Sequence, residues 1–330
     1  MASLPNSEPE ANELRTDFLG RSVVLTPRRA SRPHDFAPVV PQKSGLPAQC
    51  FFCPGNESKT PPEIERVAAD GSFKPAVSLN SPDVSKWLTR VFPNKFPAFG
   101  KNSKSAYGAH EVIVETSDHT KTLSQLDEAA FVRYLGMMAR RLRAHAKDRK
   151  IKYTCVFKNE WADAGASLEH THTQMVAMNV VPDNIKKQKR LCASSCPFCL
   201  LAVDDKFSKI IDTGPFLVVA PYAPRFNHEV WIVPRMHTAN IVDLDEEAIK
   251  ALARTLRTVL RAQDSYLNYP AYNILFFLAP HREKAFHFHI EICPRMAKWA
   301  GFEYGAETVM NSIKPEWTAA EYKEEISKLK

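Results

Sequence analysis

Residues 170–174 have the sequence His-Thr-His-Thr-Gln, and residues 287–291, 117 positions later, have the sequence His-Phe-His-Ile-Glu. Successive side chains of a β-strand point to opposite faces, so the first stretch places His170, His172 and Gln174 in one row. A pair of histidines two residues apart at two such distant places indicates that one structural unit occurs twice. These two stretches decide the interpretation of the whole chain, because the other landmarks recur around them in the same order.

The landmarks before each stretch repeat in the same order. His-Glu-Val at 110–112 and His119 recur 118 residues later, at 228–230 and His237. A helical pattern follows each (126–146 and 246–261), then an apolar strand (from 153 and from 272), and each half begins with a Cys-x-x-Cys pair. We therefore predict an α+β fold built from two tandem copies of one unit, each an antiparallel sheet with helices on one face. The copies would span 14–190 and 191–330, after a flexible tail at 1–13.

The cysteine pairs have the spacing of metal ligands. Cys-x-x-Cys at a tight turn brings two thiolates to one tetrahedral ion, and a closed zinc site needs two further ligands. The repeat nominates histidines for them and so predicts two structural zinc sites: Cys50, Cys53, His119 and His170 in the first half, and Cys196, Cys199, His237 and His287 in the second. Two alternatives stay open. In the first, the cysteine pairs are free thiols or redox pairs. In the second, His119 and His237 are ordinary polar residues at strand ends.

The composition limits the class of protein. Of the 330 residues, 44% are hydrophobic and 25% are charged, which excludes a disordered chain, and no apolar run approaches the ~20 residues of a membrane span. The N-terminus lacks the basic and apolar regions of a secretory signal, and seven cysteines are an odd number, so we expect a cytoplasmic protein without a disulfide framework. The net charge of +7 favours a polyanionic partner: nucleic acid, nucleotide or sugar phosphate.

A nucleic-acid-binding zinc module is a competing interpretation of the two cysteine pairs and the positive charge. The ligands of each predicted site are spread over some 120 and 91 positions of the sequence. Ligands of small zinc modules lie within a few tens of residues, so this spread argues against such a module. We expect neither a nucleic-acid nor a membrane partner.

The row at 170–174 suits nucleophilic attack on phosphorus. Neutral imidazole attacks without a separate base, and the phosphoramidate that forms can be discharged again, which predicts His172 as the nucleophile. Hydrogen-bond donors to the phosphate would come from Gln174, from Ser167 in the Gly-Ala-Ser turn at 165–167, and from Asn159, with charge from Arg29 and Arg32. The alternative is that the two histidines are only a metal pair or satisfied core residues.

The second half lacks parts of this row. Glu291 stands where the first half has Gln174, and no Gly-Ala-Ser turn precedes it. We therefore expect the second half to be structural. The roles of His289, of Glu291 and of the loop at His281 stay open.

Five blocks of the chain carry a family resemblance. They are Thr-Pro-Arg-Arg-Ala-Ser-Arg-Pro at 26–33, the first Cys-x-x-Cys with Ser-Asp-His at 117–119, Val-Phe-Pro-Asn-Lys-Phe-Pro-Ala at 91–98, Phe-Lys-Asn at 157–159 with 165–174, and Ala-Gly-Phe-Glu at 300–303. Together they make nearly the whole chain, from residue 15 to about residue 315, resemble the galactose-1-phosphate uridylyltransferase family, a branch of the histidine-triad superfamily.

The resemblance implies two histidine-triad-like units, a homodimer with zinc, and a ping-pong reaction through a nucleotidyl-histidine. His172 would be the nucleophile, and Gln174 and Ser167 would hold the transferred phosphate. The implied contacts to nucleotide or phosphates are Arg29, Arg32, Asn94 and Asn159, and those to the sugar are Phe302 and Glu303.

The implied activity is that of a UDP-glucose:hexose-1-phosphate (galactose-1-phosphate) uridylyltransferase, which belongs to galactose and nucleotide-sugar metabolism. The alternative is an ADP-glucose phosphorylase, which transfers an adenylyl group to inorganic phosphate. Threonines at 171 and 173, where uridylyltransferases usually carry Pro and Gly, and the second Cys-x-x-Cys pair resemble this branch more closely. Lys95 also replaces an acidic residue that many uridylyltransferases have there. A dinucleoside polyphosphate phosphorylase or hydrolase is a third possibility.

Overall fold

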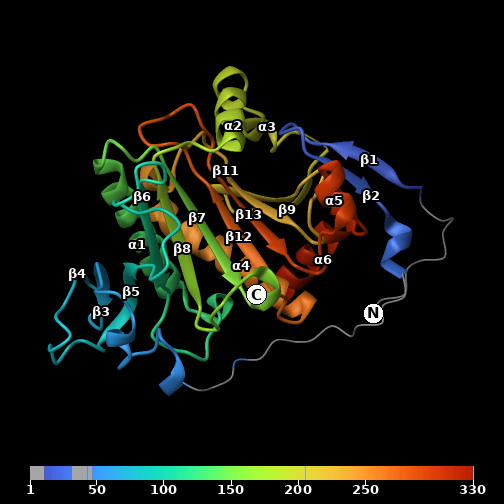
Figure 1. Ribbon diagram of the computed structural model, residues 1–330. Coiled ribbons are helices and arrows are strands. Elements are labelled where there is room, and N and C mark those ends of the chain that lie inside the picture. The colour runs from blue at the N-terminus through green and yellow to red at the C-terminus, as the bar shows by residue number, and fades with distance from the viewer. Residues whose placement is uncertain (1–10, 32–42, 44–46, 205, 330) are drawn as a thin grey trace.

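The computed structural model describes residues 11–31, 43, 47–204 and 206–329 (Figure 1). Within these residues the main feature is one antiparallel sheet of eleven strands, with helices beside it, which confirms the α+β class. Across the sheet the strands are β4 (Phe73–Pro75), β3 (Glu65–Ala68), β5 (Trp87–Pro93), β6 (Gly108–Val114), β8 (His172–Met178), β7 (Tyr153–Glu160), β12 (Tyr272–Phe277), β13 (His289–Pro294), β11 (Val230–Pro234), β10 (Phe216–Ala220) and β9 (Ser208–Asp212).

The order of the strands shows the duplication directly. Strands β7 and β12 pair at the centre, and outward from them lie β8, β6 and β5 on one side and β13, β11 and β10 on the other. Helix α1 (Glu128–Lys147) connects β6 to β7, and α4 (Glu246–Leu267) connects β11 to β12. Each begins after an aspartate, Asp127 or Asp245, whose carboxylate accepts a backbone N–H three residues on, at 2.7 and 2.8 Å. The predicted tandem duplication is confirmed.

The sequence predicts one sheet in each half, and the structure shows that the two sheets form a single continuous sheet. The sheets of the two halves join edge to edge through β7 and β12, in antiparallel register from Tyr272 opposite Glu160 to Phe276 opposite Val156. An unpaired edge strand exposes backbone donors and acceptors, and this pairing satisfies them for both halves at once. The two halves therefore share a continuous surface at the centre of the molecule.

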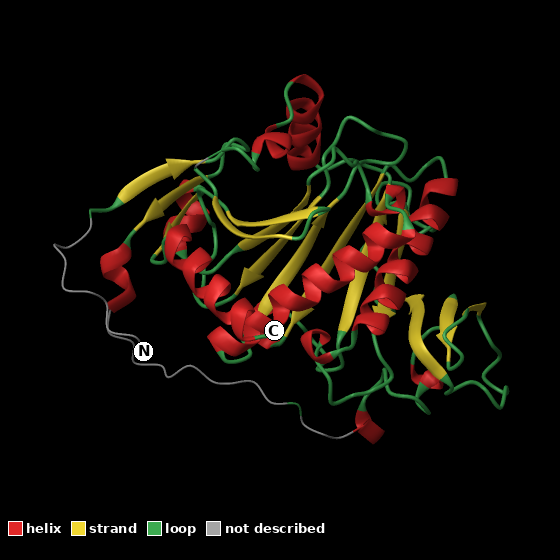
Figure 2. Cartoon of the chain, turned by 180° about the vertical axis from the view of Figure 1, so that it is seen from behind, coloured by secondary structure: helices red, strands yellow, loops and turns green. Residues whose placement is uncertain are grey.

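Three helices, α1, α4 and α6 (Pro315–Lys328), lie side by side over one face of the sheet (Figure 2). The main apolar core lies between them and the strands. Phe131 and Leu135 of α1, Leu256 of α4, and Ile274 and Ile290 of the sheet are fully buried there. The opposite face of the sheet carries smaller apolar clusters, one of them around Trp231, together with the polar side chains described below. Two shorter helices, α2 (Asp183–Ser194) and α3 (Pro197–Leu200), lie at one end of the sheet (Figure 1).

A second, smaller sheet consists of β1 (Glu13–Thr16), β2 (Ser22–Leu25) and β14 (Thr308–Asn311), with helix α5 (Gly301–Ala306) beside β14. Strand β2 runs antiparallel to β1 and parallel to β14, so the first strands of the chain lie with its C-terminal end. Most of the predicted tail, residues 1–10, lies outside the described residues, and Glu13 already belongs to β1. The division of the chain at residue 190 stays a prediction.

None of the helices in the described ranges combines the length and the apolar content needed to cross a bilayer.

Candidate active site and metal centres

Strand β8 separates two sets of side chains by its alternation. Thr171 and Thr173 point to the helix-covered side, where the hydroxyls donate to Glu115 at 2.6 Å each and Thr173 also contacts the Tyr134 hydroxyl of α1. His172 and Gln174 point to the other side. His170 lies just before the strand begins, and its ring packs near the ring of Phe52, as does that of His172.

His172 has one of its two ring nitrogens fixed by the backbone. Its Nδ1 lies 2.8 Å from the carbonyl oxygen of His170, which can only accept, so Nδ1 carries the proton and Nε2 keeps its lone pair. The side chain is 6% exposed, and burial, together with the charge of Lys158, lowers the pKa of His172. The ring is therefore neutral at physiological pH, with a nucleophilic nitrogen available at Nε2.

Gln174 is oriented by a histidine that sequence reasoning missed. The backbone N–H of Ala98 donates to His110 Nδ1 at 3.2 Å, so the neutral ring carries its proton on Nε2. That Nε2 donates to Gln174 Oε1 at 2.8 Å, and Asn94 Nδ2 lies 3.4 Å from the same oxygen. The amide nitrogen of Gln174 is thus the end left to donate to a ligand. His110 was noted only as a landmark of the repeat, and that repeat was the available signal.

The predicted phosphate turn follows β7. Asn159 Nδ2 donates to the carbonyl of Gly165 at 3.4 Å, and Gly165 has a φ of +88°, a left-handed conformation that favours glycine. Ser167 is exposed beyond this turn. The structure therefore brings Asn159 to the turn that carries Ser167. It also brings together Gln174 of β8, His110 of β6 and Asn94, which directly follows β5.

The remaining predicted contacts lie elsewhere. Arg29 is exposed in a short helical turn after β2, and Arg32 lies outside the described residues. Glu303 of α5 accepts the backbone N–H of Ala300 at 2.8 Å, and its neighbour Phe302 is 45% exposed. Among the described residues, no hydrogen bond or ion pair joins Phe302 or Glu303 to His172 or Gln174. Burial opposes the ionisation of Glu303, but backbone N–H groups and, to a smaller extent, the charge of Arg29 lower the pKa of this carboxyl.

A buried charge cluster lies beneath the row of His172 and Gln174, and the sequence did not reveal it. Lys158 of β7 is fully buried, and its ammonium lies 3.0 Å from Glu115 and 2.8 Å from Glu160. It also donates to Thr171 Oγ1 at 2.7 Å and to the His172 carbonyl at 3.3 Å. Burial opposes its charge, but the two carboxylates hold the pKa of Lys158 above its usual value. This cluster fixes the backbone of β8 from behind.

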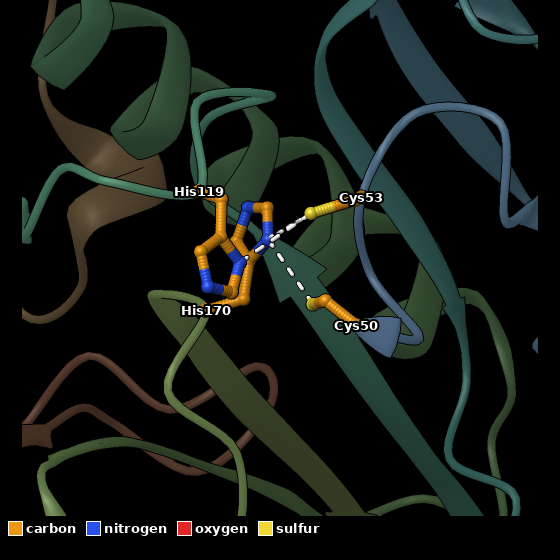
Figure 3. A group of neighbouring side chains, drawn as sticks. All are labelled: Cys50, Cys53, His119 and His170. Carbon is orange, nitrogen blue, oxygen red and sulfur yellow. Dashed lines mark hydrogen bonds between the residues drawn. The ribbon is translucent and has the colours of Figure 1, made fainter. Parts of the chain in front are cut away.

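The first metal set comes together as predicted (Figure 3). Cys50, Cys53, His119 and His170 offer ligand atoms that all lie within 4.8 Å of one another, and both histidines turn Nδ1 toward the sulfurs. The S···N distances are 3.4 to 3.5 Å. Zinc at about 2.3 Å from sulfur and 2.0–2.1 Å from nitrogen, with tetrahedral angles, would separate these atoms by about 3.6 Å.

The tautomer of His170 also fits a metal ligand. Its Nε2 donates to the carbonyl of Thr116 at 2.8 Å, which leaves the Nδ1 lone pair directed at the two sulfurs. The donor set and its spacing therefore fit a tetrahedral ion of the zinc type.

The second metal set has the same design. Cys196, Cys199, His237 and His287 lie within the same limit, with S···Nδ1 distances of 3.4 to 3.5 Å. His287 Nε2 donates to the carbonyl of Pro234 at 2.8 Å, as His170 does to Thr116. Cys199 and His237 are exposed, whereas the first set contains no exposed ligand. Both sets predicted from the repeat are therefore assembled in space.

In the second half, His289 and Glu291 occupy the positions that correspond to His172 and Gln174, and both are packed against other side chains of the chain. The ring of His289, which corresponds to His172, is fully buried between Phe198 and Phe277, with centroid distances of 4.3 and 4.7 Å. Glu291, which corresponds to Gln174, binds Arg21 at 2.8 Å and Arg225 at 2.5 Å. Burial opposes its ionisation, but the two arginines hold the pKa of Glu291 well below its usual range. Both positions of this row are therefore engaged by side chains of the chain itself.

The comparisons with known proteins identify the family. The family model described as galactose-1-phosphate uridyl transferase, N-terminal domain, matches residues 8–182, and the chain belongs to this family. A model of a domain of unknown function matches residues 104–330.

Two curated relatives are similar over most of the chain. The ADP-glucose phosphorylase of Arabidopsis thaliana is 30% identical, over 94% of this chain and 92% of the relative. The galactose-1-phosphate uridylyltransferase of Thermotoga maritima is 29% identical, over 87% of this chain and 91% of the relative. A crystal structure of an A. thaliana ADP-glucose phosphorylase with bound ADP-glucose superposes with a TM-score of 0.81, at 29% identity, and covers 95% of this chain and 99% of that one. The chain is therefore a nucleotidyltransferase of the type that includes both enzymes.

Proposed function

We propose that the protein transfers a nucleotidyl group from a nucleoside diphosphate sugar to a phosphate acceptor, through a covalent intermediate on His172. The observation that carries this proposal is the geometry of the buried His172 ring. Its Nδ1 proton is held by the His170 carbonyl at 2.8 Å and its pKa is lowered, so Nε2 is an unprotonated nucleophile.

The reaction proceeds in two displacements. In the first, His172 Nε2 attacks the α-phosphorus, a P–N bond forms, and the bond to the bridging oxygen breaks with release of sugar 1-phosphate. In the second, an oxygen of the acceptor phosphate attacks the same phosphorus and the P–N bond breaks. The proton on Nδ1 stays on the ring throughout, and the His170 carbonyl stabilises the positive charge that the ring acquires.

Hydrogen-bond donors near His172 would hold the transferred phosphate. Gln174 presents its amide nitrogen because His110 occupies its oxygen, and Asn159 of β7 and Ser167 of the turn after it would add further donors. Donors of this kind stabilise charge on the equatorial oxygens of the transition state. Arg29 and Arg32 would add positive charge, as the family resemblance implies.

Two zinc ions would close the structural sites at Cys50, Cys53, His119 and His170, and at Cys196, Cys199, His237 and His287. A bound zinc ion would supply a rigid cross-link between distant segments of the chain. In the first site it would hold the backbone of His170, whose carbonyl orients His172, and in the second it would hold the start of β13.

Two donor and acceptor pairs are candidates. ADP-glucose with inorganic phosphate is favoured by the similarity to the A. thaliana ADP-glucose phosphorylase, both in sequence and in structure. UDP-glucose with galactose 1-phosphate, the pair that the sequence analysis favoured, is supported by the similarity to the T. maritima uridylyltransferase. A dinucleoside polyphosphate would be the donor to try if neither sugar nucleotide reacts.

The expected homodimer offers a role for α5. Phe302 and Glu303 make no described contact with the His172 row of their own chain, so we propose that they serve the sugar site across a dimer interface. Light scattering of the purified protein would give twice the chain mass if this is correct, and a monomer with full activity would contradict it.

An exchange experiment tests the proposed chemistry. The enzyme is mixed with ADP-glucose and radiolabelled glucose 1-phosphate, without other acceptor, and the same is done with UDP-glucose. A covalent intermediate regenerates the sugar nucleotide from the labelled sugar phosphate, so label should enter one of the two donors. Turnover with phosphate but no exchange of label would contradict the two-displacement reaction.

A further inference from the structure

We propose that Asn273, on β12 of the C-terminal half, is a positioning residue that sets the amide orientation of Asn159 and fixes the turn after β7. This role rests on the proposed function, since it concerns the donors that hold the transferred phosphate. The residue lies directly opposite Asn159 in the pairing of β12 with β7, where the two halves meet.

The contacts of Asn273 determine which end of its amide is the nitrogen Nδ2 and which is the oxygen Oδ1. Its Nδ2 lies 2.9 Å from Asn159 Oδ1 and 2.8 Å from the carbonyl oxygen of Ala164. A carbonyl oxygen can only accept, so the nitrogen of Asn273 must face Ala164. Arg295 Nη1 lies 3.4 Å from Asn273 Oδ1, and a guanidinium can only donate, so it requires the oxygen at that end. Both neighbours thus require the same orientation.

The orientation of Asn273 in turn determines that of Asn159. Because Asn273 donates toward it, Asn159 must present its oxygen to β12 and its nitrogen to the turn. The nitrogen does lie on that side, 3.4 Å from the Gly165 carbonyl. If the amide were reversed, a carbonyl oxygen would face the phosphate and repel it. The Arg295–Asn273–Asn159 relay therefore keeps a donor, and not an acceptor, on the phosphate side.

The same amide also anchors the turn that bears Ser167. The bond to the Ala164 carbonyl holds the short helical segment Ala162–Ala164, and a second tie joins Asp163 to Lys298 at 3.1 Å. Asn273 and Lys298, which make these two contacts, both belong to the C-terminal half. In that half His289, the counterpart of His172, is buried between Phe198 and Phe277. The second copy of the unit thus contributes to the active site by positioning the donors of the first copy.

An isosteric substitution tests this role. Asn273→Asp keeps the shape but removes both donations, and the carboxylate would turn the nitrogen of Asn159 toward itself. The readout is the rate at which the wild type and variants form a nucleotidyl adduct with ADP-glucose or UDP-glucose, followed by quenching and intact-protein mass. We expect a loss on the order of 10²-fold, the usual cost of one misplaced donor at a developing oxyanion. The concentration of donor that gives half the maximal rate should change much less.

A double variant separates positioning from general damage. If Asn273 acts mainly through Asn159, then Asn159→Ala with Asn273→Asp should lose far less than the product of the two single losses. The loss beyond that of Asn159→Ala alone would come from the bond between Asn273 and the Ala164 carbonyl. Independent damage would multiply the two losses. Arg295→Met removes the donor to Asn273 Oδ1 without changing a residue of β12. It should slow adduct formation less than Asn273→Asp does.

The matched control is Asn311→Asp in the small sheet. Asn311 also donates its amide nitrogen to two backbone carbonyls, those of Pro224 and Phe226, at 2.9 and 3.1 Å. It should lower the unfolding temperature while adduct formation stays within about twofold of the wild type. Equal rates for Asn273→Asp and the wild type, or multiplying losses in the double variant, would overturn the positioning role. Absence of any adduct in the wild type would overturn the proposed function itself and this role with it.

Discussion

Removing the buried ammonium of Lys158 should destabilise the protein strongly. Lys158 and Glu115 are fully buried and Glu160 is 3% exposed, and the ammonium lies within 3.0 Å of both carboxylates. Lys158→Met keeps an unbranched apolar stem of similar volume but leaves two buried carboxylates without a cation. Breaking a buried ion pair in this way typically costs about 3–5 kcal/mol of unfolding free energy. We expect a loss in that range here.

The compensating variant makes the prediction specific to charge. Adding Glu115→Gln and Glu160→Gln to Lys158→Met removes the uncompensated charges and keeps side chains that can accept from Thr171 and Thr173. We expect the triple variant to regain at least half of the lost stability, because replacing a whole buried ionic cluster with neutral groups costs far less than breaking it.

Urea unfolding measures these differences. Trp87 and Trp231 are buried, so tryptophan fluorescence reports the transition, and linear extrapolation gives the unfolding free energy. Zinc should be kept saturating in all samples, so that metal loss does not contribute. A loss below about 1 kcal/mol for Lys158→Met, or a triple variant as unstable as the single one, would refute the electrostatic reasoning.

Two further predictions concern the metal sites and acid stability. Cys50→Ser or Cys196→Ser should each lower the zinc content by about one equivalent per chain, measured by atomic emission, and two equivalents in either variant would break the assignment. Although burial opposes ionisation, hydrogen bonds from Arg141 and His145 lower the pKa of Glu111 from about 4.5 to about 2. Its folded pKa lies below the unfolded one, so this carboxylate contributes up to about 3 kcal/mol above pH 5, which is lost as the pH falls toward 2. Unfolding free energies measured from pH 6 to pH 3 should therefore decline less steeply in Glu111→Gln, and an unchanged slope would contradict the prediction.

The repeat in the sequence predicted much of the fold and of the metal sites. Cysteine and histidine are specific ligands, so four landmarks in the same order were enough to group Cys50 with His170 and Cys196 with His287. The long helices were also predictable, because apolar positions recur with helical period and an aspartate stands at each start. The alternation of 170–174 correctly placed His172 and Gln174 on one face.

Other features could not be predicted, because they depend on pairing in three dimensions. The joining of the two sheets through β7 and β12 leaves no mark in the local pattern of either strand. Lys158 occurs in a polar stretch, and only the structure shows that it is buried between two carboxylates. His110 and Asn273 act by fixing the amides of Gln174 and Asn159, and the direction of an amide is a property of its neighbours.

The most direct test of the account is the mass of the protein itself. Wild type and His172→Ala are each mixed briefly with ADP-glucose or with UDP-glucose, without acceptor, and intact masses are recorded. We predict that the wild type gains one nucleotidyl group from one of the two donors, and that His172→Ala gains none while keeping its fold and its zinc. An adenylyl gain would assign the phosphorylase activity, and a uridylyl gain the uridylyltransferase activity. A wild type that gains no mass from either donor, or a His172→Ala variant that still does, would contradict the central claim.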